Sequence, residues 1–140
     1  MKTLLITGIG GLTPRSIATV IREKYPHYHV IGIDADKKAM GFFMRTRDGR
    51  KLVDEYYVCP RCDNQAYFPF VEKLVAEKHI DYAFVQPEAE IVEWGDYMRN
   101  TVSFHAKSLW AVKNCRNPCV INLLWLIFLK ALTLFQRPSR

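Results

Sequence analysis

Short apolar runs alternate with segments of helical spacing along the first hundred residues. Four apolar runs, at residues 4–6, 29–33, 55–59 and 81–85, have the length and composition of buried strands. Residues 13–25, 67–79 and 90–98 repeat apolar positions every three or four residues, which is typical of helices with one buried face. This alternation predicts a Rossmann-like α/β domain over residues 1–98, with a mainly parallel sheet and helices on both faces.

The first predicted strand runs into a glycine-rich turn, Thr7-Gly8-Ile9-Gly10-Gly11. Thr13 is expected to cap the following helix, and Pro14 to lie in its first turn, where a missing N–H has no consequence. The second strand ends on Asp34, and ligands of doubly wound sheets gather at the carboxyl ends of strands. The stretch therefore predicts a site where backbone amides lie beside an acid.

The glycines match the dinucleotide-binding fingerprint only in part, because that fingerprint needs three glycines for the turn, the pyrophosphate and helix packing. Read as Gly-x-Gly-x-x-Gly, the third place falls on Thr13. Read as the Thr-Gly-x-x-Gly-x-x-Gly form of short-chain dehydrogenases, it falls on Pro14, and the Tyr-x-x-x-Lys pair of that family is absent from the sequence. Nicotinamide binding, an anion at the helix N-terminus and a turn without a ligand all stay open.

Charge and hydropathy change near residue 100. The 140-residue chain has a formal net charge of +6, and residues 1–100 contain all 14 acids with 14 of the 20 Lys and Arg. Because this part is neutral, we expect no nucleic-acid partner.

Residues 121–135 are almost wholly apolar but shorter than the roughly 20 residues of a membrane span. They predict an apolar helical tail through which a homo-oligomer could form. We do not expect this tail to insert into a membrane. Met1 leads directly into a strand, so a cytoplasmic location is expected.

Four strand-end segments together resemble the N-terminal, pre-ATP-grasp domain of ATP-grasp ligases, in their carbamoyl-phosphate-synthase-like branch. These segments are residues 7–15, 34–36, 57–61 and 86–90. The resemblance implies a domain that contacts a small acceptor substrate, whereas ATP and Mg²⁺ belong to later domains of the complete enzyme. Residues 101–140 contain no acid and no glycine. We therefore expect a domain that is not catalytic alone, a truncated or frame-shifted end over residues 99–140, and a separate chain carrying the ATP-grasp domains.

Eight residues are expected to bind the substrate or an anion: Gly8, Gly10, Gly11, Thr13, Arg15, Asp34, Glu88 and Glu90. The backbone amides of Gly10 and Gly11, with Thr13, would cradle an anion, and Arg15 would add charge. Asp34 would accept hydrogen bonds from a hydroxyl or amine, while the two glutamates would orient an amine. A simpler interpretation also stays open, in which the acids cap loops or helices and Arg15 pairs with a neighbouring acid.

The four cysteines allow a second kind of site. Cys59 and Cys62 have the spacing of a zinc knuckle or a redox pair, and Cys115 with Cys119 could complete a four-thiolate zinc site. The expected cytoplasmic location favours reduced, unspecialised thiols. We therefore expect no metal and no cofactor bound by this chain alone.

Two alternatives to a ligase domain follow from the same residues. The first is a stand-alone Rossmann domain that binds a dinucleotide or a nucleotide sugar, which predicts binding by residues 1–98 and sensitivity to Gly10→Val. The second is a non-catalytic interaction fragment, in which residues 121–135 drive association.

Overall fold

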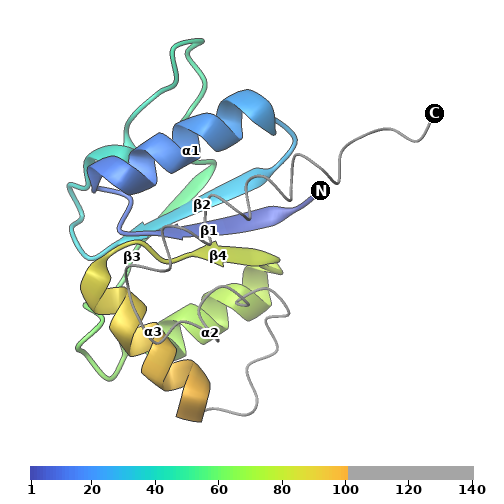
Figure 1. Cartoon of the computed structure of the whole chain (residues 1–140). Helices are drawn as coiled ribbons and strands as arrows, with labels where there is room; N and C mark the ends of the chain where they lie inside the picture. Colours follow the sequence, from blue (N-terminus) through green and yellow to red (C-terminus); the bar gives the residue numbers. More distant parts are fainter. Residues whose placement is uncertain (101–140) are drawn as a thin grey trace.

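A computed structural model describes residues 1–100 of the chain. The strands are β1 (Thr3–Thr7), β2 (His29–Asp34), β3 (Glu55–Val58) and β4 (Tyr82–Phe84). The helices are α1 (Leu12–Lys24), the 3-10 turn η1 (Met40–Phe42), α2 (Tyr67–Lys78) and α3 (Glu88–Asn100). The strands lie in the order β3-β2-β1-β4, and all neighbours are parallel. Helix α1 covers one face of this sheet, and α2 and α3 cover the other (Figure 1). The predicted Rossmann-like α/β fold is confirmed.

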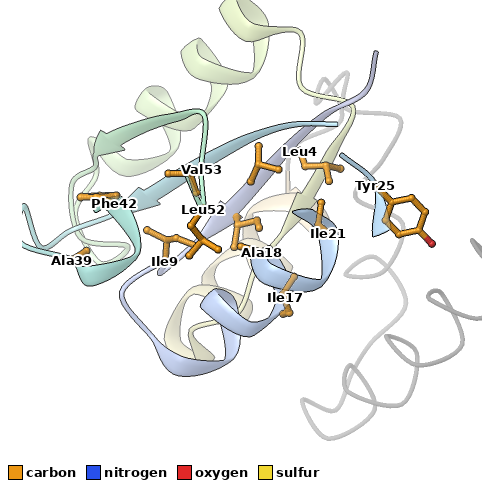
Figure 2. Packing of buried hydrophobic residues seen from close by; sticks show 12 residues of the cluster. Leu4, Ile9, Ile17, Ala18, Ile21, Tyr25, Ala39, Phe42, Leu52 and Val53 are labelled. Atoms are coloured by element: carbon orange, nitrogen blue, oxygen red, sulfur yellow. The ribbon is translucent and has the colours of Figure 1, made fainter. Parts of the chain in front are cut away.

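Each face of the sheet has its own apolar core, because successive residues of a strand point to opposite faces. Leu4 and Ile6 of β1 pack toward α1, where Ile17 and Ile21 repeat at helical spacing (Figure 2). The intervening Leu5 packs on the opposite face, in the core shared with α2 and α3. The central strands are therefore apolar on both faces, as their unbroken apolar runs predict.

Buried Arg22 ties the last turns of α1 to the connection that precedes β3. Its Nε donates to the carbonyl of Leu52 at 3.0 Å, and its Nη2 lies 2.6 Å from Oδ2 of Asp54. The second contact is an ion pair by distance, although its angles are not those of a hydrogen bond. Asp54 also accepts from the amide of Val30 at 2.8 Å, so one carboxylate joins α1, β2 and the start of β3.

The connection between β2 and β3 has one helical segment, the three-residue turn η1, which packs tightly against the glycine-rich loop. A Cβ on Gly41 would lie 2.2 Å from the carbonyl oxygen of Ile9, so η1 can approach the loop backbone only because Gly41 has no side chain. Figure 2 shows Phe42 and Ala39 beside Ile9 in this arrangement.

The N-cap of helix α1 lies two residues earlier in the chain than the sequence predicts. Its N-cap is Gly11, with extended backbone (φ −70°, ψ 156°) and no side-chain cap, so the prediction that Thr13 caps the helix is wrong. The tight turn from Gly8 to Gly11 brings the chain into helical direction before Thr13 is reached. Pro14 lies in the first turn, as predicted, and it is buried.

The described part of the chain ends at Asn100, where the bounds of α3 also end. No helix within residues 1–100 is long and apolar enough to cross a membrane. The apolar segment 121–135, Cys115 and Cys119 lie outside the described residues, and their expected roles stay predictions.

Candidate functional site

The glycine-rich loop lies at the carboxyl edge of the sheet, against the loop that follows β4. The amide of Gly11 donates to the carbonyl of Gly8 at 2.9 Å, which closes the turn. Gly8 has a positive φ of 60°, and a Cβ there would lie 2.3 Å from Cγ of Pro87. Two loops far apart in sequence therefore meet at Gly8.

Asp34, at the end of β2, holds this loop in place. Its Oδ2 accepts from the amide of Gly10 at 2.8 Å, and its Oδ1 accepts from the amide of Asp36 at 2.9 Å. A Cβ on Gly10 would lie 3.0 Å from the same Oδ2 and 3.2 Å from Cβ of Ala39, so the bulk of valine there would displace the carboxylate. An ionised carboxylate has about four acceptor positions, so Asp34 can accept further hydrogen bonds.

The unoccupied amides of this region lie at the start of α1. The amides of Gly10 and Gly11, expected to cradle an anion, already donate to Asp34 and Gly8. Within residues 1–100, no acceptor is found for the amides of Leu12 and Thr13, and both residues are exposed. These are first-turn amides, which intrahelical hydrogen bonds leave free. Sequence reasoning missed Leu12 because it placed the start of the helix at Thr13.

Arg15 brings a positive charge to the η1 side of the loop. Its Nε donates to the carbonyl of Gly11 at 3.0 Å, and its Nη1 lies 2.7 Å from Sδ of Met40 and 3.4 Å from Sδ of Met44. None of the ion pairs among the described residues includes Arg15, so the simpler interpretation of a salt bridge is not found there. Its charge is therefore available beside the loop.

The two glutamates of α3 lie in different environments. Glu88 is exposed in the first turn, whereas Glu90 is 9% exposed. The hydroxyl of Tyr67 donates to Oε2 of Glu90 at 2.9 Å, and Nε1 of Trp94 donates to that hydroxyl at 3.0 Å. Burial raises the pKa of Glu90, hydrogen bonds from Thr7 and Tyr67 oppose that rise, and the charge of Asp34 adds to it. Glu90 thus joins α3 to β1 and α2.

We expect Glu90→Gln to stabilise the domain increasingly as pH rises. The raised pKa means that the folded chain holds this proton more tightly than the unfolded chain. Protonated Glu90 therefore stabilises the unaltered domain fully below the pKa of the unfolded chain. This stabilisation is lost as pH rises through the pKa of the folded chain. Glutamine stays neutral and keeps an oxygen for Tyr67. Urea unfolding of both chains at pH 4 and pH 8 measures the difference, and an equal difference at both values contradicts the assignment.

The described cysteines lack the features of reactive thiols. Cys59 is buried, and burial raises the pKa of its thiol to about 12. Burial also raises the pKa of Cys62, which is half-buried. A redox or metal-binding thiol needs a stabilised thiolate. In the part of the chain that the structure describes, no group of three or more metal-binding side chains is present.

Comparison with known proteins extends to solved structures alone, since neither a protein-family model nor a curated protein matches this chain. One similar structure is dTDP-glucose 4,6-dehydratase from Bacillus anthracis in complex with NAD, with 15% identity and a TM-score of 0.52. The match covers 71% of this chain and 34% of the dehydratase chain. Another is ADP-L-glycero-D-manno-heptose-6-epimerase from Helicobacter pylori, with 26% identity, a TM-score of 0.42 and coverage of 61% and 26%, respectively.

The dehydratase structure corrects the resemblance to ATP-grasp ligases. This similar structure, with a TM-score of 0.52, is not a ligase, so the carbamoyl-phosphate-synthase-like ligase assignment is contradicted. The expected ATP, Mg²⁺ and ATP-grasp partner chain rested on that resemblance and lose their basis with it. The physical reason is that a glycine turn after one strand and an acid after the next serve any doubly wound sheet. The dehydratase match, spanning about a third of that protein, establishes for this chain the Rossmann-type fold.

Proposed function

We propose that this chain binds the diphosphate group of a nucleotide, as found in a dinucleotide or a nucleotide sugar, at the carboxyl edge of its sheet. The observation that carries the proposal is the pair of unoccupied amides of Leu12 and Thr13, next to the loop that Asp34 holds. Amides at a helix N-terminus point outward and favour a negatively charged ligand.

The loop leaves room for such a ligand to approach the backbone. Gly11 is exposed and places no side chain beside the amides of Leu12 and Thr13. A phosphate at the amides of Leu12 and Thr13 would lie beside Gly11, with the charge of Arg15 nearby on the η1 side. The chain can therefore offer two amides and one guanidinium to a diphosphate.

Asp34 supports a ribose next to that diphosphate. Two of its acceptor positions hold the loop, and the remaining ones can accept from ribose hydroxyls. A carboxylate at this place favours a free 2′-hydroxyl and disfavours a 2′-phosphate. We therefore expect NAD to bind more tightly than NADP.

Leu12→Pro tests the amide contact directly. Proline suits the first helical position, and the extended backbone of Gly11 is the conformation that a residue before proline prefers. The substitution removes one amide hydrogen and should preserve the helix. Losing one hydrogen bond to a charged group, about 1.5–3 kcal/mol, should weaken binding of NAD or ADP about 10- to 100-fold by titration calorimetry.

Leu12→Ala is the matched control, since it removes the exposed side chain and keeps the amide. It should bind as the unaltered chain does. Equal weakening by both substitutions would place the contact on the leucine side chain instead. Failure of the unaltered chain to bind NAD, NADP, ADP or a nucleotide sugar would refute the proposed function.

A further inference from the structure

The connection between β2 and β3 concentrates positive charge. Residues 37–51 contain six of the 14 basic and one of the 14 acidic side chains of residues 1–100, so the neutral total conceals an uneven distribution. All six basic residues are exposed: Lys37, Lys38, Arg45, Arg47, Arg50 and Lys51. Nε of Arg50 lies 2.7 Å from Oδ2 of Asp48, and no ion pair found among the described residues includes the other five.

Residues 43–52 of this connection form a hairpin, which we call the basic hairpin. Two amide-to-carbonyl hydrogen bonds join its sides: Leu52 to Met44 at 2.9 Å and Thr46 to Arg50 at 2.8 Å. Between these hydrogen bonds, Arg45 and Lys51 form an antiparallel bridge. Figure 1 shows this connection projecting beyond α1. The backbone therefore presents the charges at a protruding edge of the domain.

The basic hairpin has a covered face and an outward face. Three alternate residues are buried or half-buried: Met44, Thr46 and Leu52. Phe43, Arg45 and Lys51 are exposed, and alternation along the two sides places them together on the outward face. Like charges directly opposite each other destabilise paired strands. Arg45 and Lys51 are such a pair, and an anionic partner would relieve their repulsion.

Exposed apolar side chains adjoin this outward face. Phe43 is 64% exposed, and Met40 in η1 is 58% exposed. The ring of Phe43 meets that of Tyr56 edge-on, with centroids 5.8 Å apart. Buried Phe42 in turn stacks on Tyr56 at 4.6 Å. Phe43 is therefore supported by its neighbours while most of its surface faces solvent beside the cations.

We propose that the basic hairpin binds the surface of a membrane that contains anionic lipids. Such a surface attracts Lys and Arg through its headgroups and takes up apolar side chains at the boundary with the acyl chains. A nucleic acid also attracts cations, but it has no apolar layer for the side chain of Met40. The inference goes beyond the proposed function and does not rest on it, because the amides of Leu12 and Thr13 belong to another segment.

The test measures how tightly the full chain sediments with vesicles of equal parts phosphatidylserine and phosphatidylcholine. The unaltered chain should bind these vesicles more tightly than vesicles of phosphatidylcholine alone. Arg45→Gln/Lys51→Gln should weaken binding to the anionic vesicles about 30-fold, because each cation near such a surface contributes about fivefold. Phe43→Ala should weaken it about tenfold, and concentrated salt should remove the effect of the charge variant alone.

Lys24→Gln/Lys73→Gln is the matched control, since it removes two exposed cations from α1 and α2. It should bind anionic vesicles as the unaltered chain does. Urea unfolding shows whether the charge variant is intact. Its midpoint should equal or exceed that of the unaltered chain, because the repulsion between Arg45 and Lys51 is gone. A lower midpoint would show that this pair stabilises the fold, and the argument from repulsion would be wrong.

Three results would overturn the inference. The first is equal binding of the two kinds of vesicle by the unaltered chain. The second is anionic-vesicle binding that neither Phe43→Ala nor the charge variant weakens, which would place the lipid contact elsewhere in the chain. The third is binding of a DNA duplex, lost in the charge variant, by a chain that ignores anionic vesicles. Failure to bind nucleotides would refute the proposed function and leave this inference standing.

Discussion

Gly8→Ala is expected to destabilise the domain by about 3 kcal/mol. The left-handed backbone at Gly8 (φ 60°) costs a residue with a Cβ about 1–2 kcal/mol. The new Cβ would also lie 2.3 Å from Cγ of Pro87, and overpacking of this kind costs about 1–3 kcal/mol. Because Pro87 immediately precedes α3, the clash would separate the β1 and β4 loops. Urea unfolding should show a lower midpoint with an unchanged slope.

Gly49→Ala is the control that separates backbone strain from steric clash. Gly49 has φ 83°, and nothing lies within 4 Å of the position that its Cβ would take. Alanine there should destabilise by only about 1 kcal/mol. Equal losses for Gly8→Ala and Gly49→Ala would show that Pro87 yields and that contact between the two loops does not constrain the site.

Asp54→Ala is expected to destabilise the domain by about 3 kcal/mol. It leaves the Arg22 guanidinium, whose side chain is 6% exposed, without its carboxylate. Removing one partner of a buried ion pair costs about 3–5 kcal/mol, and the 35% exposure of the Asp54 side chain places the effect at the lower end. The substitution also frees the amide of Val30, which donates to Asp54. Chemical unfolding at neutral pH measures the loss.

Arg22→Met distinguishes an isolated buried charge from loss of the ion pair itself. Methionine fills similar space without a charge, and replacing a buried charge by an apolar group is often nearly neutral. The double variant Arg22→Met/Asp54→Ala should then be more stable than Asp54→Ala alone. If adding Arg22→Met destabilises Asp54→Ala further, the guanidinium contributes through its bond to the Leu52 carbonyl and the assigned cause is wrong.

The sequence was misleading where its signal is shared by many folds. The glycine turn and Asp34 could be recognised from the sequence because each adjoins a short apolar run. A glycine turn and an acid at these places are shared by several doubly wound families. The ligase assignment therefore failed although the fold prediction was confirmed. Arg15 and Glu90 were equal candidates in the sequence, and the structure separates them. Glu90 is buried among Thr7, Tyr67 and Trp94, whereas Arg15 has no acid partner among the described residues.

The sequence by itself determined the elements of this domain, since short unbroken apolar runs indicate buried strands and apolar positions every three to four residues indicate helices. It also determined that glycines and an acid follow β1 and β2. The tertiary structure decided which amides stay free, because Asp34 reaches Gly10 only through the pairing of distant strands. It likewise decided that Tyr56 and Val58 stay exposed, since a covering segment depends on packing between elements and not on the spacing within one.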